Sequence, residues 1–127
     1  MTVAGLGLDL IDLAHFAIHY GDEDLELLER CFTAQEIVAA GDGTDRLARL
    51  AGRFAVKEAT FKALGGGADI AHIDIETVSG DDGAPQIKLI GAANDLASRR
   101  GIVSFLVSTS HSAASAGAVV IGLAGPT

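Results

Sequence analysis

One long amphipathic segment, residues 45–64, most restricts the folds open to this chain. Its large apolar residues recur three, four and seven positions apart, as a helix requires, and three glycines at 65–67 end the pattern. Shorter helical patterns cover 22–32, 33–40 and 92–100. Alternating or β-branched apolar runs predict strands at 3–10, 73–78, 85–90, 102–111 and 115–123. This order predicts an α+β fold, a mostly antiparallel sheet packed against one long helix and shorter helices.

The length and composition indicate how many domains the chain has and in which cellular compartment it acts. The 127 residues contain no repeat, linker or low-complexity stretch, so we expect a single domain over residues 1–127. No apolar run approaches the roughly 18 residues that cross a bilayer, and no leader peptide pattern opens the sequence, so we expect no membrane partner. The single cysteine, Cys31, cannot form an internal disulfide, which favours the cytoplasm.

The charge is acidic overall but unevenly distributed. A net charge of −8, from 17 acidic and nine basic residues, argues against nucleic acid as a partner. Five of the nine basic residues nevertheless lie within the long helical segment: Arg46, Arg49, Arg53, Lys57 and Lys62. All but Lys62 fall on one arc beside the apolar stripe. That arc is either a solvated face, on which the aliphatic parts of the side chains cover apolar surface, or a local site for a small anion.

Glu58 occupies an apolar position of the same segment. On a helical wheel the stripe runs through Leu47, Leu50, Phe54 and Phe61, and Glu58 fills the slot between the two phenylalanines. A partly desolvated carboxylate needs a cationic partner, which is either a side chain or a metal ion. Lys62 is correctly spaced for a helical ion pair worth roughly 0.2–0.5 kcal/mol. Several cations beside one carboxylate also suit a site where phosphates and a divalent metal meet.

Asp9 supplies a second candidate carboxylate at the end of the first strand. It shares a strand face with Gly5 and Gly7, whose missing side chains allow another element to approach closely. Asp9 either caps the helix that follows or joins Glu58 in holding Mg²⁺, with substrate phosphate oxygens completing the octahedron.

Histidines form two further candidate groups. His111 follows Ser110 at the end of the strand 102–111, either as a turn histidine with capping serines or as a donor to a phosphate. A serine-hydrolase site is not expected, because the G-x-S-x-G turn is absent. His15 and His19 are four residues apart, but without a nearby carboxylate or cysteine at ligand spacing they indicate surface histidines rather than zinc ligands.

Three motifs, in this order, closely resemble the holo-acyl-carrier-protein synthase family of 4′-phosphopantetheinyl transferases: GLGLDL (5–10), AGRFAVKEATFKALG (51–65) and VSTSH (107–111). GAPQIKL (83–89) also matches the G-x-P segment of that family, so the resemblance covers essentially the whole chain. It implies transfer of the phosphopantetheine arm of coenzyme A to a serine hydroxyl of an apo acyl carrier protein or carrier domain. It further implies release of 3′,5′-ADP, a role in fatty acid biosynthesis, and a homotrimer with each site between two subunits.

The resemblance also assigns roles to residues. Asp9 and Glu58 match the magnesium ligands, and Glu58 is expected to accept the proton of the carrier serine directly or through water. Lys62 matches the lysine that faces the pyrophosphate, and Lys57 is expected to have a supporting catalytic or phosphate role. The remaining matched positions are expected to bind the nucleotide: Arg53 and His111 at its 3′-phosphate, with Ser110 and Pro85 lining its pocket.

One departure from the family concerns the carrier. The family often has an arginine where this chain has His15, on the helix that docks the acidic carrier, and residues 21–29 are strongly acidic. Docking charge then comes from Arg46, Arg49 or another subunit, or else the carrier is a domain of a large multifunctional synthase. Two other functions stay open, a non-enzymatic coenzyme A- or nucleotide-binding module and an oligomeric structural domain. A binding module gains little from a desolvated Glu58, which favours the transferase.

Overall fold

The computed structural model describes residues 1–21, 24–66 and 69–126. Its strands form two antiparallel sheets, in the orders β1-β5-β4 and β2-β3, so the expected α+β class is confirmed and the strands divide into two groups. The elements run in the order β1 (Thr2–Asp12), α1 (Leu13–Tyr20), α2 (Leu25–Cys31), α3 (Ala34–Ala40), α4 (Arg46–Ala63), η1 (His72–Asp74), β2 (Ile75–Ser79), β3 (Pro85–Leu89), α5 (Ala92–Arg99), β4 (Ile102–His111) and β5 (Ser115–Ala124).

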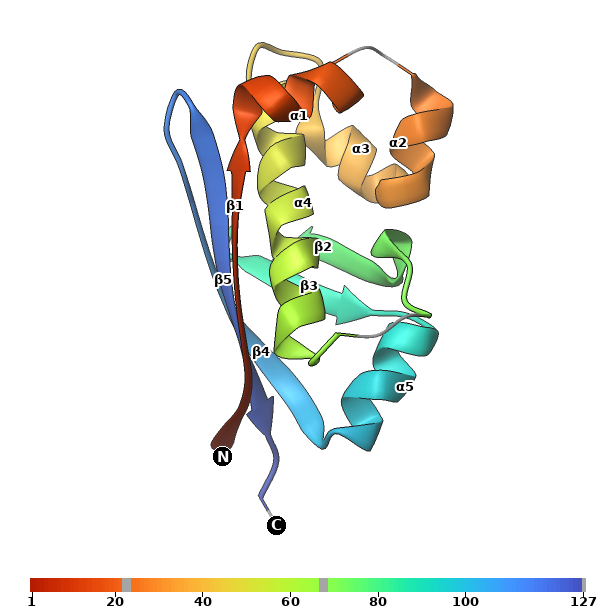
Figure 1. Ribbon diagram of the computed structural model, residues 1–127, viewed down its shortest axis with the longest axis vertical. Helices are drawn as coiled ribbons and strands as arrows, with labels where there is room; N and C mark the ends of the chain where they lie inside the picture. Colours follow the sequence, from red (N-terminus) through yellow and green to blue (C-terminus); the bar gives the residue numbers. More distant parts are fainter. Residues whose placement is uncertain (22–23, 67–68, 127) are drawn as a thin grey trace.

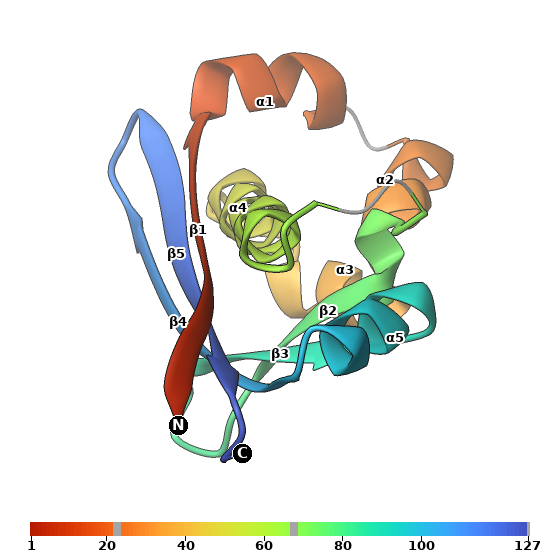
Figure 2. The same cartoon turned by 60° about the horizontal axis from the view of Figure 1, so that its bottom comes forward.

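Helix α4 is the central element of the fold (Figure 1). Viewed almost along its axis, it lies between the three-stranded sheet on one side and β2, β3, α3 and α5 on the other (Figure 2). Both ends of the chain lie at the same end of the three-stranded sheet, where Thr2 pairs with Ala124. In the part of the chain that the structure describes, no helix combines the length and apolarity needed to span a bilayer.

Strand β1 lies unusually close to α4 because of two glycines. A Cβ atom at Gly7 would lie 1.7 Å from the carbonyl oxygen of Ala59, and one at Gly5 would lie 1.9 Å from that of Ala63. The alanines of α4 present an equally small surface to the strand. The expectation that this glycine face admits a close neighbour is confirmed, and the same face carries Asp9 toward α4.

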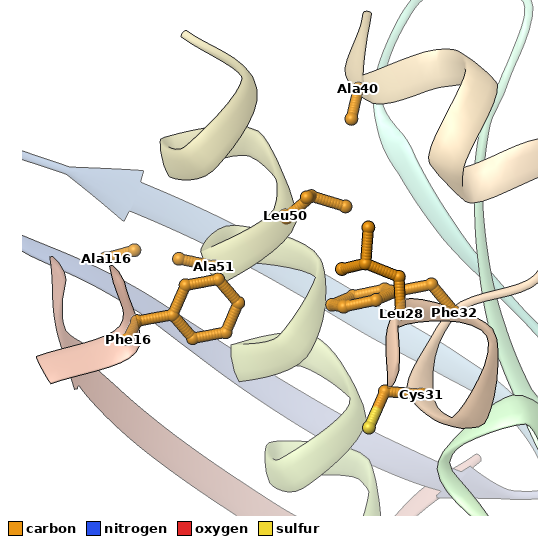
Figure 3. Packing of buried hydrophobic residues seen from close by; sticks show 8 residues of the cluster. All are labelled: Phe16, Leu28, Cys31, Phe32, Ala40, Leu50, Ala51 and Ala116. Atoms are coloured by element: carbon orange, nitrogen blue, oxygen red, sulfur yellow. The ribbon is translucent and has the colours of Figure 1, made fainter. Parts of the chain in front are cut away.

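The buried face of α4 differs from the predicted apolar stripe. Leu50 is fully buried as expected, whereas Phe54 and Phe61 are only half-buried. Alanines at every fourth position from 51 to 63 lie deepest, because the helix is pressed against the sheet. Figure 3 shows one part of this core, in which α4 separates Phe16 of α1 from Phe32 at the end of α2. Small residues contribute little to a hydrophobic pattern, so the wheel underestimates them.

The structure shows which residues cap helices α1 and α3. The side chain of Asp12 accepts from the backbone N–H of Ala14 at 2.9 Å, so Asp12 caps α1 and the capping interpretation of Asp9 is wrong. The capping box predicted for α3 is confirmed, with Thr33 and Glu36 each accepting from the other's backbone N–H.

Candidate active site

Two carboxylates from distant parts of the chain meet where β1 runs alongside α4. Asp9 and Glu58 line one open pocket together with the exposed histidines of α1. The Lys62 ammonium donates to the carbonyl oxygen of Leu8 at 2.8 Å and lies 3.5 Å from Oδ1 of Asp9. Strand β1 and helix α4 thus bring together the three residues that the resemblance assigns to metal and pyrophosphate.

The electrostatics of this pocket favour a bound cation. Burial against α4 raises the pKa of Asp9 above its ordinary 3.8, the Lys62 ammonium partly offsets this rise, and the negative charge of Glu58 adds to it. Asp9 and Glu58 are therefore close enough to repel each other in a partly desolvated setting, where the side chain of Asp9 is 19% exposed. A divalent cation between two such carboxylates would relieve that repulsion.

The donor set suits magnesium better than zinc. Mg²⁺ commonly takes one or two protein carboxylates and completes its octahedron with water and phosphate oxygens. Across residues 1–21, 24–66 and 69–126, no group of three or more His, Cys, Asp or Glu side chains is arranged to hold a metal. His15 and His19 pack edge to face, with ring centroids 5.2 Å apart, and both are exposed, which confirms the prediction of surface histidines.

The Glu58 carboxylate forms a hydrogen bond with His72. Its Nε2 lies 3.2 Å from Oε1 of Glu58, and its ring stacks on Phe54 at 5.0 Å and meets Phe61 edge-on at 5.1 Å. The slot that the wheel leaves between the two phenylalanines therefore holds a carboxylate and an imidazole. Among the described residues no ion pair joins Glu58 to Lys62, so the simple helical salt bridge is a wrong interpretation.

Lys57 lies in a different environment from the one that its position on the helical wheel predicts. The expectation of an exposed basic arc is wrong for this residue, because its side chain is completely buried. Its ammonium pairs with Oε1 of Glu36 at 2.7 Å and also donates to the carbonyl oxygens of His72 and Ile75. Burial lowers the pKa of Lys57, and the Glu36 carboxylate opposes that change. A supporting role for Lys57 would therefore act through the structure rather than through contact with a phosphate.

Glu36 also joins the buried Lys57 to strand β2. Its Oε2 accepts from the backbone N–H of Thr77 at 2.9 Å and from the Thr77 hydroxyl at 2.7 Å. Arg53 in turn donates through Nη1 to the carbonyl oxygen of Thr77 at 2.8 Å. The network fixes one edge of the Arg53 guanidinium beside β2 and leaves the residue at the rim of a second cleft.

This second cleft gathers the residues that the resemblance assigns to the nucleotide. Arg53, Pro85, Ser110 and His111 all line it, at a place where α4 faces β2 and the end of β4. Arg49 adds a second guanidinium to the same lining. Cations, a hydroxyl and an imidazole around one cleft are suitable donors for phosphate oxygens.

The two clefts lie on different sides of α4. They share no lining residue, and Glu58 and Arg53 are five positions apart, which is about 140° around the helix. One chain therefore brings Asp9, Glu58 and Lys62 to one place and the nucleotide residues to another.

Tyr20 and His72 are the functional candidates that sequence reasoning missed. Tyr20 lines the carboxylate pocket, and its hydroxyl lies 3.4 Å from Sγ of Cys31. Burial, followed by that contact, raises the pKa of Tyr20 to about 12, so the phenol is neutral at physiological pH. His72 lies 14 residues beyond Glu58, outside any helical spacing. Neither residue belongs to a local pattern that could have identified it.

The chain is similar to known proteins over nearly its whole length. Residues 5–118 match the family model of the 4′-phosphopantetheinyl transferase superfamily. The chain is 37% identical over 121 residues to a holo-[acyl-carrier-protein] synthase of Frankia casuarinae, which covers 95% of this chain and 98% of that protein. It is 38% identical over 123 residues to the fatty acid synthase alpha subunit hexA of Dothistroma septosporum, covering 94% of this chain and 7% of that protein.

A solved structure extends the likeness to three dimensions. The holo-[acyl-carrier-protein] synthase of Helicobacter pylori, solved in complex with coenzyme A, superposes with a TM-score of 0.80 at 32% identity. The match covers 93% of this chain and 99% of that one. The chain therefore belongs to the 4′-phosphopantetheinyl transferase superfamily.

Proposed function

We propose that this chain transfers the phosphopantetheine arm of coenzyme A to a serine hydroxyl of an apo acyl carrier protein or carrier domain, for fatty acid biosynthesis. The observation that carries the proposal is the meeting of Asp9, Glu58 and Lys62 where β1 runs alongside α4. Family membership and the coenzyme A complex of a 32% identical relative support the same substrate. The single cysteine supports a cytoplasmic location.

The carboxylate pocket would hold the reacting groups. Mg²⁺ held by Asp9 and Glu58 would supply positive charge to the pyrophosphate oxygens. Glu58, directly or through a water, takes the proton from the carrier serine as its oxygen bonds to the phosphorus that carries pantetheine. The bond from that phosphorus to the bridging oxygen breaks, and 3′,5′-ADP leaves with the electron pair. Lys62, with its ammonium beside Asp9, offsets charge on the pyrophosphate during this step.

The second cleft would hold the nucleotide. Arg53 and His111 are the donors we assign to the 3′-phosphate, while Ser110 and Pro85 line the same cleft. Arg53 suits this task because its hydrogen bond to Thr77 fixes the guanidinium before the ligand arrives. Lys57 is assigned no contact with substrate, because its ammonium is enclosed by protein atoms.

A homotrimer, with each site between neighbouring copies, is part of the proposal. The separation of the two clefts supports it, since a second copy could bring its nucleotide cleft to the carboxylate pocket of the first. The outer face of the three-stranded sheet also supports it, because Leu6, Leu8 and Leu10 of β1 are 63%, 66% and 74% exposed. Across the register they lie beside Ile121 and other apolar positions of β5. Light scattering should give a smaller molecular mass for a Leu8→Glu variant than for wild type. An unchanged mass would contradict this interface.

The carrier is proposed to be a domain of a multifunctional synthase. His15 and the acidic residues of α2 offer little positive charge to a free-standing acidic carrier. The likeness to a fungal fatty acid synthase subunit supports the same choice. Transfer rates onto a carrier domain and onto a free-standing acidic carrier should differ in favour of the domain. Equal or better rates with the free-standing carrier would contradict this part of the proposal.

One assay tests the proposed reaction. The protein is incubated with coenzyme A, Mg²⁺ and an apo carrier, and the carrier mass is followed over time. Wild type should add the mass of phosphopantetheine, and Glu58→Gln should abolish the gain while keeping the wild-type unfolding curve. Coenzyme A binding without a mass gain on either kind of carrier would instead support a non-enzymatic binding module. An active Glu58→Gln variant would contradict the metal assignment.

A further inference from the structure

We propose that His72 is a positioning residue that orients the Glu58 carboxylate for metal binding and proton transfer. The inference rests on the function proposed above, and it assigns a role to a residue outside the motifs that the resemblance rests on. His72 lies in the short helix η1 between α4 and β2, and its side chain is 30% exposed. Its imidazole contacts Glu58, one of the residues that line the carboxylate pocket.

The hydrogen bond between His72 and Glu58 has a defined direction. An ionised carboxylate only accepts, so the imidazole tautomer that pairs with it carries the hydrogen on Nε2, and His72 then donates to Oε1 of Glu58 across 3.2 Å. Oε2 then remains available for other partners. A donor on one oxygen selects the rotamer of the carboxylate and hence the direction in which the other oxygen points.

Two phenylalanine rings pack against the imidazole. Its plane lies within 17° of the Phe54 ring, at a centroid distance of 5.0 Å, and the Phe61 ring meets it at 79° and 5.1 Å. Both phenylalanines come from α4, one turn before and one turn after Glu58. The helix that carries the carboxylate thus also fixes the plane of the ring that donates to it.

The backbone of His72 is anchored to the buried ion pair. The Lys57 ammonium donates to the carbonyl oxygen of His72 at 3.0 Å and pairs with Glu36 at 2.7 Å. The carboxylate of Asp74 accepts from the backbone N–H of Ala71 at 3.1 Å and closes the start of η1. A continuous set of contacts therefore runs from α3 through Lys57 to His72 and ends at Glu58. This is the indirect support that Lys57 can give to the reaction.

Orientation of a metal-binding carboxylate has a measurable effect. Removing the hydrogen bond that orients a metal ligand typically costs about 10–100-fold in metal affinity or activity. A purely structural role for His72, as filler between two phenylalanines, predicts no such loss when another ring takes its place. The two roles can therefore be separated by replacing His72 with residues that keep either its shape or its donor.

The test compares His72→Phe, His72→Leu and His72→Gln. Phenylalanine keeps the stack without a donor, leucine keeps apolar bulk, and glutamine places an amide N–H near the position of Nε2. Mn²⁺ binding to each protein, without coenzyme A, is measured by electron paramagnetic resonance, and thermal unfolding is recorded in parallel. We expect about tenfold weaker binding for Phe and Leu. For Gln we expect affinity within about threefold of wild type. Wild-type affinity in either folded variant without a donor would overturn the inference.

Two controls separate this inference from the function on which it rests. If wild type binds Mn²⁺ and Glu58→Gln does not, the metal site stands, and the His72 variants alone decide the inference. If wild type binds no Mn²⁺, the metal site and the role of His72 fall together. In the transfer assay, His72→Phe should lower kcat and leave the KM for coenzyme A unchanged, because the nucleotide cleft is on another side of α4. Recovery of kcat by glutamine is expected, and equal kcat for Phe and Gln would count against a positioning role.

Discussion

Two lysines of α4, five positions apart, show how differently one helix can use the same side chain. On the side facing β2, Lys57 is completely buried and pairs with Glu36. On the side facing β1, Lys62 is 55% exposed and lies beside Asp9. The first lysine links three elements of the fold, whereas the second places its charge beside Asp9, which lines the carboxylate pocket. The comparison indicates that charge in this segment serves stability on one side of α4 and chemistry on the other.

The largest effect should come from removing the buried lysine. Lys57→Met leaves the Glu36 carboxylate without its cation inside the protein, which should lower the free energy of unfolding by about 3–5 kcal/mol. Lys62→Met is the matched control on the exposed side and should change it by about 1 kcal/mol or less. Urea denaturation measures both. Similar losses for the two variants would break the comparison.

For catalysis we expect the opposite order, with the exposed Lys62 contacting the substrate and the buried Lys57 acting only through the structure. Lys62→Met removes an ammonium that we place beside the pyrophosphate, and kcat for transfer should fall about 10²–10³-fold, as for other charge-stabilising donors. Its unfolding curve should stay close to that of wild type. The assay is the mass gain on the carrier at saturating coenzyme A. A fall of less than about threefold would show that Lys62 has no direct role in the transition state.

Pushing β1 away from α4 should have a smaller effect on stability and on metal affinity. The Cβ of Gly7→Ala would overlap the carbonyl oxygen of Ala59, so the strand must move away, at a cost of about 1–3 kcal/mol in the free energy of unfolding. Mn²⁺ affinity should fall as well, because Asp9 moves with β1. Gly43→Ala is the matched control, since nothing lies within 4 Å of its Cβ. A stable Gly7→Ala variant would show that the contact tolerates a methyl group.

The smallest effect concerns the protonation of Asp9. In metal-free protein, carbon-13 NMR of its carboxyl should report a pKa above 3.8, mainly because of burial. Lys62→Met should raise that pKa further and Glu58→Gln should lower it, because the two charges act in opposite directions. Protonated Asp9 cannot bind a cation, so Mn²⁺ affinity should fall as the pH drops through this value. A lower pKa in Lys62→Met would contradict the assigned arrangement.

Much of the fold could be predicted because it depends on local patterns. The strand that carries Asp9, the capping box at Thr33 and the glycines that stop α4 are all visible in short windows of sequence, although β1 continues to Asp12, past the expected end. Asp9 and Glu58 were also identifiable, one from a glycine-lined strand face and the other from its slot between two phenylalanines. The close approach of β1 to α4 follows from the same glycines.

The remainder depends on contacts between distant residues. Lys57 is buried because Glu36 reaches it from 21 positions earlier in the chain, and nothing within α4 indicates that partner. His72 meets Glu58 only because η1 folds back over α4. The short connections after β2 and after β4 predict that each of these strands pairs with the next one, as the structure shows. Nothing local shows that β1 pairs with β5, so the division into two sheets was not predictable.

The central claim is that Asp9 and Glu58 form one metal site, and a double-mutant cycle on Mn²⁺ affinity tests it most directly. Asp9→Asn and Glu58→Gln should each weaken binding strongly, and the double variant should lose little more than the worse single variant. Asp24→Asn, which alters the cap of α2 away from this pocket, should bind as wild type does. Strictly additive losses, or wild-type affinity in either single variant, would contradict a shared site.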